Sequence, residues 1–364
     1  MPDSLRVPLA RPRPDAAAFI RALDGEVKPQ RPPLIEYVVD NVIIRPVVVD
    51  MLGRRWVDPV PGDRASLAAY LDNYVAFWQH LGYDTLHYFI GLPFAHRTVA
   101  APDTASAGRG MRHWSEQHTP FIASWDDFER YPWPCVGQVD FFPIEYLSSH
   151  LPEGMGLTAE HNSHSAELLS DAFTYEGLCL ALHDQPDLVQ AVAERIGALV
   201  LGFYEQLADF DSVVAFFAGD DMGFRSGTLI SPEDLRRYVV PWHAANARVA
   251  HAHRKRYYLH SCGNLEAIVA DLVETVRIDG KHSFEDAIIP VEDFHRRYGG
   301  RISSLGGVDV DVLARGGEED VRRRTHQVID ACTPLGRVAV GSGNSIPSYV
   351  PLANYLAMVA EALR

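Results

Sequence analysis

Short runs of β-branched and other apolar residues alternate along the chain with longer amphipathic stretches. Most of the apolar runs are too continuous for a sheet that exposes one face to water, so they fit strands covered by helices on both sides. Strands that alternate with helices predict a parallel sheet. Eight runs are expected to be strands: 34–39, 85–90, 156–160, 213–218, 256–260, 276–282, 302–305 and 338–341.

Helix start signals fall between these runs. Asp184-Gln185-Pro186-Asp187 predicts a helix to about Leu207, with Pro in the first turn and an acid at the positive end of the helix dipole. Ser231-Pro232-Glu233-Asp234 is a capping sequence for a helix to about Arg254, with a kink at Pro241. A closing helix is expected over residues 351–363.

Eight strand–helix units without a Gly-rich dinucleotide-binding turn after the first strand favour a closed (β/α)₈ TIM barrel over an open doubly wound sheet. We expect residues 1–14, rich in Pro and Arg, to be a flexible tail, and residues 15–364 to form a single barrel domain. The stretch 97–153, with Trp114, Trp125 and Trp133, is predicted to contain an insertion after the second strand that helps to roof the site.

Composition narrows the function classes. The formal net charge of −15 argues against binding to nucleic acid, because phosphate neutralisation requires a basic face. The basic runs 254–256 and 322–324 are interpreted as solvated helix faces. Four cysteines in 364 residues do not suggest a disulfide framework. With no signal-like apolar segment and no run of about 20 apolar residues, a soluble cytoplasmic protein without membrane contact is expected.

The most informative motif ends the fifth predicted strand, where His260 and Cys262 stand two residues apart. In an extended chain both side chains point to the same side, and imidazole with thiolate is a ligand pair suited to Zn²⁺. The alternative is a buried Cys that packs as a small apolar group beside a hydrogen-bonded His. In a barrel, this strand end is where functional loops begin.

Two neighbouring strand ends carry further candidates. Glu285, after the sixth predicted strand, is our choice for a third metal ligand, with His282 as an alternative ligand and a solvated or capping carboxylate as the alternative role for Glu285. Asp220 and Asp221 follow the fourth strand, where one could act as acid or base, since a like-charged neighbour raises a carboxyl pKa. Helix capping is the alternative for both.

Further residues are expected to face the cavity or to bind substrate. Glu36, His87 and His161, with His164 beside it, fall where their side chains can face the cavity of a barrel. Arg225, in the loop after the paired aspartates, offers a bidentate fork for a substrate carboxylate.

Taken together, several segments resemble the uroporphyrinogen decarboxylase superfamily, in its corrinoid-dependent and methionine synthase-like methyltransferase branch. The likeness extends from about Asp15 and is strongest from Val213 to Pro351. Its motifs are Gly219-Asp220-Asp221-Met222-Gly223, Ser231-Pro232-Glu233, Pro241-Trp242-His243, His260-Ser261-Cys262-Gly263-Asn264, 281–286, 306–309 and 341–345.

The resemblance implies a (β/α)₈ barrel and a zinc ion held by His260, Cys262 and Glu285. One position departs from the pattern, since Ser342 stands where a late Cys ligand is expected. Three protein ligands with an open fourth position suit a catalytic zinc ion. True uroporphyrinogen decarboxylases carry an Arg-Gln-Ala-Gly-Arg-Tyr motif after the first strand and an Asp after the second, both missing here, which argues against porphyrinogen decarboxylation.

Three functions follow. The first is a zinc-dependent methyltransferase that moves a methyl group between a small substrate and a corrinoid protein, a thiol or a pterin. The second is a metal-free decarboxylase or lyase for a carboxylated small molecule, using Arg225 and Asp221. The third is a binding protein that kept the fold. Any corrinoid is expected on a separate protein, and related barrels suggest a homodimer.

Overall fold

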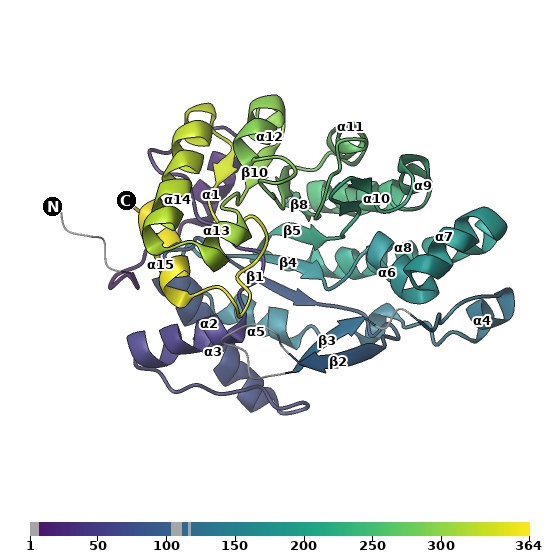
Figure 1. The fold of residues 1–364 in the computed structure, drawn as a ribbon. Helices are drawn as coiled ribbons and strands as arrows, with labels where there is room; N and C mark the ends of the chain where they lie inside the picture. The colour runs from purple at the N-terminus through teal and green to yellow at the C-terminus, as the bar shows by residue number, and fades with distance from the viewer. Residues whose placement is uncertain (1–6, 103–110, 116–117) are drawn as a thin grey trace.

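Seven parallel strands form one curled sheet in this computed structural model, which describes residues 7–102, 111–115 and 118–364, with side chains except at 101–102 and 111–115. Helices surround the sheet on its outer side (Figure 1). In sheet order the strands are β1 (Thr85–Ile90), β4 (Gly156–His161), β5 (Val213–Gly219), β8 (Arg256–His260), β9 (Gly280–His282), β10 (Ser303–Leu305) and β11 (Val338–Ala339).

The expected closed barrel of eight strands is not formed among the described residues. The segment 34–39 makes only isolated parallel bridges, Leu34 with Val340 and Val39 with Ile346, and no ladder joins it to β1. Between these bridges, the Ser342 N–H donates to the Glu36 side chain at 2.7 Å rather than to a backbone carbonyl. The sheet is therefore TIM-barrel-like but open between this segment and β1.

A second correction concerns the run 276–282. Its first residue ends a π-helical turn, Leu272–Val276, and Arg277 is left-handed with φ of 63°. The strand is therefore confined to β9. The other six predicted strands are confirmed within a few residues of their bounds.

The predicted helices are confirmed. α8 spans Pro186–Leu207, and the helix expected from Ser231 is divided into α9 (Pro232–Tyr238) and α10 (Val240–Ala252) next to Pro241. α15 (Leu352–Ala362) closes the chain. Further helices are α2 (Asn41–Pro46), α3 (Arg64–His80), α6 (Ser165–Phe173), α7 (Tyr175–Asp184), α11 (Val269–Asp271), α12 (Val291–Tyr298), α13 (Val310–Arg315) and α14 (Glu318–Cys332).

Helix α1 (Ala16–Leu23) covers the amino-terminal ends of the strands. Asp15 caps it by accepting the Ala18 N–H at 2.8 Å, and its last carbonyl, that of Leu23, accepts a bond from Ser303 at the start of β10. Phe19 and Leu23 are buried against apolar side chains that fill the inside of the curled sheet: Ile35, Ala215, Phe217, Tyr258, Leu305 and Ala339. The amino end is thus closed by packing, and the carboxyl end is left for the site.

The expected insertion separates β1 from β4. It holds an antiparallel pair, β2 (Thr98–Pro102) and β3 (Met111–Ser115), followed by α4 (Trp125–Arg130) and α5 (Phe142–His150). Trp125 is exposed and Trp133 packs on Tyr131 within the same segment. The side chain of Trp114 lies outside the described residues, so its share in a roof stays a prediction.

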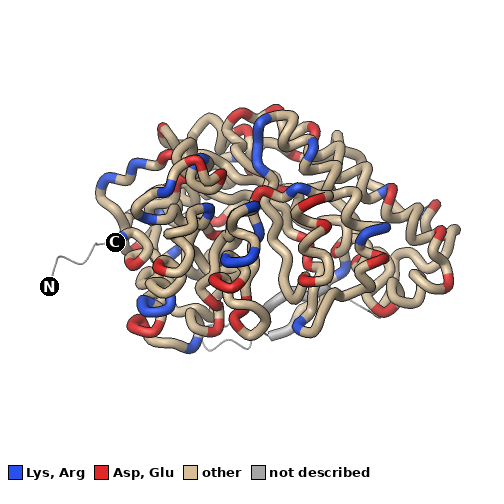
Figure 2. Tube along the Cα trace, turned by 90° about the horizontal axis from the view of Figure 1, so that it is seen from above, with Lys and Arg blue, Asp and Glu red and all other residues tan. Residues whose placement is uncertain are grey.

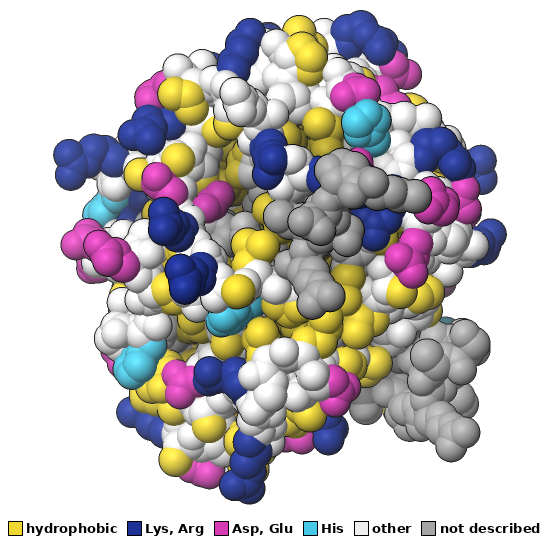
Figure 3. Space-filling model, turned by 90° about the vertical axis from the view of Figure 1, so that its left-hand side faces the viewer, with side chains coloured by type: hydrophobic (Ala, Val, Ile, Leu, Met, Phe, Trp, Pro, Cys, Tyr) yellow, Lys and Arg dark blue, Asp and Glu magenta, His cyan; other side chains and the backbone are white. Residues whose placement is uncertain are grey.

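Charged groups are interspersed over the molecule rather than gathered by sign (Figure 2). On the side shown in Figure 3, charged side chains lie mainly around the rim. Two members of the basic runs are not solvated as expected: Arg324 is buried between Asp286 and Glu292, and Lys255 donates to the carbonyls of Phe210 and Val213. Among the described helices, none has both the length and the apolar character needed to cross a bilayer.

Candidate metal centre

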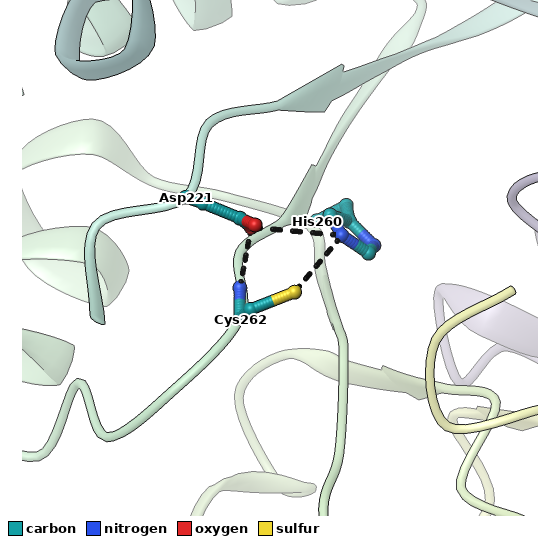
Figure 4. A group of neighbouring side chains, drawn as sticks. All are labelled: Asp221, His260 and Cys262. Carbon is teal, nitrogen blue, oxygen red and sulfur yellow. Dashed lines mark hydrogen bonds and ion pairs between the residues drawn. The ribbon is translucent and has the colours of Figure 1, made fainter. Parts of the chain in front are cut away.

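Asp221, His260 and Cys262 meet at the carboxyl ends of β5 and β8 (Figure 4). The two strands are paired so that Gly219 lies opposite His260, which brings the residues two positions further on side by side. The His260 Nε2 lies 3.4 Å from the Cys262 Sγ and 3.7 Å from the Asp221 Oδ1. The Cys262 N–H donates to Asp221 Oδ1 at 2.8 Å, which fixes this carboxylate beside the pair.

The hydrogen bonds behind His260 determine which of its nitrogens is free. His282 Nε2 lies 3.2 Å from the Ser342 carbonyl, which can only accept, so this nitrogen carries the proton. Burial lowers the pKa of His282 to about 3, so its Nδ1 is an acceptor for the Nδ1–H of His260, 2.7 Å away. The Nε2 of neutral His260 therefore presents a lone pair toward Cys262 and Asp221.

An aromatic ring supports His260 from the other side. Tyr37 stacks on the His260 ring with centroids 4.1 Å apart and planes 10° apart. Its hydroxyl donates to Glu160 at 2.5 Å, and Glu160 also accepts the Gly219 N–H and contacts His87 Nε2 at 3.3 Å. The His260 ring is thus held by the stacked Tyr37 ring on one side and by His282 at its Nδ1.

The groups around the Cys262 thiol have opposite effects on its pKa. Burial and the nearby Asp221 carboxylate raise its pKa well above the ordinary value, so without a cation it is a thiol. The Asn344 side-chain amide donates to its sulfur at 3.1 Å. The thiol can donate to His260 Nε2, or it can lose its proton to a cation that both groups bind.

The three donor groups fit a zinc ion. Tetrahedral zinc with bonds of about 2.0–2.3 Å places its ligand atoms about 3.4–3.6 Å apart. The observed separations from His260 Nε2, 3.4 and 3.7 Å, are close to this spacing, and all three ligand atoms lie within 4.8 Å of one another. A thiolate, an imidazole and a carboxylate are also a ligand set that zinc accepts.

Glu285, the expected third ligand, lies outside this group. After β9 the chain turns toward the loop that follows β11, where Phe284 N–H donates to the Gly343 carbonyl at 2.7 Å. Phe284 is buried by this turn and Glu285 is carried outward and exposed. The structure brings Asp221 to the pair instead, from the strand on the other side of β8.

Asp220 has a positioning role in this arrangement. It is fully buried and accepts the N–H groups of Ala166 and Glu167 at the start of α6, and it lies 2.8 Å from His243 Nε2. The capping alternative therefore describes Asp220, while its neighbour Asp221 faces the site with a side chain that is 41% exposed.

Most of the residues expected to bind substrate are instead hydrogen-bonded within the protein. Both ring nitrogens of His161 are engaged by backbone groups, at Leu92 and Ser163, and burial lowers its pKa to about 4. His164 bonds the Gly219 carbonyl and the Tyr204 hydroxyl. His87 lies buried in the Glu160 network, next to the centre but not in it.

Glu36 and Arg225 also lie away from the centre. Glu36 accepts both the N–H and the hydroxyl of Ser342, at 2.7 and 2.6 Å, and burial raises its pKa to about 8. The Ser342 side chain thus points to Glu36 and not to the position of a metal ligand. Arg225 is exposed at the turn between β6 (Gly223–Phe224) and β7 (Gly227–Thr228).

Sequence reasoning missed four residues around the site: Tyr37, Glu160, Glu167 and Asn344. Tyr37 and Glu160 fall in predicted strands, but period-2 alternation alone does not show which polar strand residues meet inside a curled sheet. Asn344 belongs to the glycine-rich stretch after β11, two residues beyond Ser342, where a Cys ligand is expected. This closeness to Ser342 in the sequence was the signal that could have pointed to Asn344.

Comparison with known proteins identifies the family. The sequence model described as "Uroporphyrinogen decarboxylase (URO-D)" matches residues 144–364, more than half of the chain. No curated protein matches the chain. Among solved structures, a methyltransferase from Methanosarcina mazei superposes with a TM-score of 0.68 at 14% identity, covering 96% of this chain and 98% of the other.

A xylanase B from Clostridium stercorarium F9 matches with a TM-score of 0.41 at 12% identity, over 61% of this chain and 84% of its own, which carries no argument about the site. The chain belongs to the uroporphyrinogen decarboxylase family. The likeness to the methyltransferase establishes a shared fold at this level of identity.

Proposed function

We propose that this protein is a zinc-dependent methyltransferase that moves a methyl group between a small substrate and a corrinoid protein, a thiol or a pterin. The observation that carries the proposal is the juxtaposition of Cys262 and Asp221 with the free Nε2 of His260. Family membership and the fold shared with a methyltransferase support it. His260, Cys262 and Asp221 are the proposed ligands, in place of the set with Glu285.

When bound, zinc supplies a Lewis acid that lowers the pKa of a substrate thiol or polarises the oxygen of a methoxy group. Residues around the proposed ligands hold them in position. His282 and Tyr37 hold the His260 ring, Asn344 donates to the Cys262 sulfur, and Asp220 anchors the loop by capping α6. A corrinoid, where the reaction uses one, is proposed to arrive on a separate protein.

The first test is the metal content per chain, measured by mass spectrometry of protein purified without added metal. We expect close to one zinc ion in the wild type and in Cys332→Ala, a control at a buried cysteine of α14, and almost none in Cys262→Ala. Wild-type protein that stays free of zinc even after zinc is offered contradicts the proposal and favours the metal-free lyase.

A pair of conservative variants separates the two candidates for third ligand. Asp221→Asn is expected to weaken zinc binding at least tenfold, because it removes the charge beside His260, whereas Glu285→Gln changes an exposed side chain and is expected to leave affinity unchanged. The reverse result assigns the ligand to Glu285.

Activity separates an enzyme from a binding protein. Methylcobalamin and a simple thiol such as 2-mercaptoethanol, mixed with the zinc-loaded protein, are expected to show thiol methylation followed through the corrinoid absorbance. The Cys262→Ala variant is the control. Metal binding without turnover for any methyl donor or acceptor pair supports the binding-protein alternative.

A further inference from the structure

A cavity of about 470 Å³ opens beside Asp221, between the carboxyl ends of β4 and β5. Cavities of this size hold small organic ligands, and the carboxyl ends of the strands are where barrels bind substrate. The cavity is floored by the strand ends and walled by α6, α7 and α9. Tyr175 closes one rim by donating its hydroxyl to the Leu229 carbonyl at 2.6 Å.

The wall has two chemically different parts. One part is apolar, contributed by five side chains: Leu178, Met222, Leu229, Ile230 and Leu235. The other carries three carboxyl groups, on Glu167, Asp171 and Asp221. Among the described residues that line the cavity there is no Lys or Arg, and the one His, His96, lies 3.3 Å from Asp171.

The carboxyl groups are placed to act on a ligand. Glu167 and Asp171 are one helical turn apart on α6, so both point to the same side, and Asp221 faces them from the end of β5. The Asp221 N–H lies 3.4 Å from a Glu167 oxygen, which keeps the two side chains together. Arg225, expected to bind a substrate carboxylate, is exposed on the neighbouring hairpin and does not line the cavity.

We infer that this cavity is the substrate pocket, and that it takes an amine: a small molecule with an apolar body and an ammonium group, held by Glu167 and Asp171 on α6, while Asp221 is left to the proposed metal. A carboxylate next to α6 would meet the carboxyl groups of Glu167 and Asp171 and no Lys or Arg among the described lining residues, so an anion is expected to bind there more weakly. The inference rests on the proposed function in one respect, since Asp221 is also a proposed metal ligand.

The test uses three probes of one shape and different charge: benzylamine, benzyl alcohol and benzoate. Their dissociation constants are measured by ligand-observed NMR titration against the full-length wild type. We expect benzylamine to bind most tightly and benzoate at least tenfold more weakly. Benzoate binding as tightly as benzylamine, or no selectivity among the three, overturns the inference without any variant being needed.

A cavity-filling variant tests the location. Ser170→Phe places a ring in the cavity from α6 and is expected to weaken benzylamine binding at least tenfold, whereas the control Ser149→Phe, on the exposed end of α5, leaves it unchanged. Equal binding to both variants overturns the assignment to this cavity.

Zinc content of the same samples distinguishes the two proposals. Zinc-loaded protein without amine selectivity contradicts this inference alone. Selective amine binding by protein that takes up no zinc supports the pocket and contradicts the proposed function.

Discussion

Tyr37 supports His260 through its ring rather than through its hydroxyl, which is used by Glu160. Tyr37→Leu removes the stacking surface, and we expect zinc affinity to fall about tenfold, as for other groups that orient metal ligands. Tyr37→Phe keeps the ring, so affinity should change little while stability falls by about 1–3 kcal/mol, since Glu160 loses a buried bond. Competition with a chromogenic chelator measures the affinity and urea unfolding the stability. A Phe variant as weak in zinc binding as the Leu variant would show that the hydroxyl matters instead.

Glu36 is expected to make stability depend on pH. Burial raises its pKa to about 8, while a Glu in an unfolded chain titrates near about 4.3. Between these values the folded state keeps a proton that the unfolded state releases. The contribution of Glu36 to the stability of the folded state is therefore complete below about pH 4 and is lost as the pH rises through about 8.

The variant Glu36→Gln is neutral at every pH. Its amide oxygen can accept the Ser342 N–H, and its NH2 group can donate to the Ser342 hydroxyl. We expect the wild type to lose stability relative to this variant between pH 5 and 8, by at most about 1.4 kcal/mol per pH unit. Urea unfolding at four pH values measures the difference, with Glu26→Gln, at an exposed position, as the control. Parallel curves for wild type and Glu36→Gln would show that Glu36 titrates normally.

At the scale of residues, local spacing predicted that His260 and Cys262 lie together, because both belong to one strand end. The third group could not be assigned in this way. Strand β8 has a neighbour on each side, and sequence order draws attention to β9 and Glu285, whereas the register of β5 brings Asp221 next to Cys262. Choosing between them requires knowing that the chain turns away at Phe284.

Two loops, after β5 and after β8, touch through glycines, and this contact holds Asp221 beside Cys262. Gly263 has φ of +82°, and a Cβ there would lie 2.2 Å from the Gly223 carbonyl carbon. Gly263→Ala is therefore expected to cost about 2 kcal/mol or more in stability through backbone strain and overlap, and to weaken zinc binding. Gly227→Ala, in the same hairpin region, meets no atom within 4 Å and serves as the control. Thermal unfolding and metal content are measured for both variants. Equal unfolding temperatures and equal zinc content in the Gly263→Ala and Gly227→Ala proteins would contradict this expectation.

At the scale of elements, hydrophobic runs and capping signals predicted most strands and helices, since each depends on neighbours in sequence. The segment 34–39 shows where this reasoning ends. Its apolar pattern is that of a strand, but pairing depends on partners far away, and the Glu36 side chain takes the Ser342 N–H. Whether a sheet closes is likewise a property of all its strands together.

At the scale of the whole molecule, the proposed metal would join elements that are distant in sequence. Its ligands come from the ends of β5 and β8, and the groups around them come from β9 and the loop after β11. Binding that favours the folded state stabilises it by about 2.7 kcal/mol when free metal is at 100 times the dissociation constant. For a single domain of this length this corresponds to roughly 3–4 °C in Tm. We therefore expect chelation of zinc from the wild type to lower Tm by about that amount, and readdition of zinc to restore it. The Cys262→Ala variant should unfold at the same temperature with and without chelator. A chelator effect of equal size in both proteins would place the stabilising metal elsewhere in the chain.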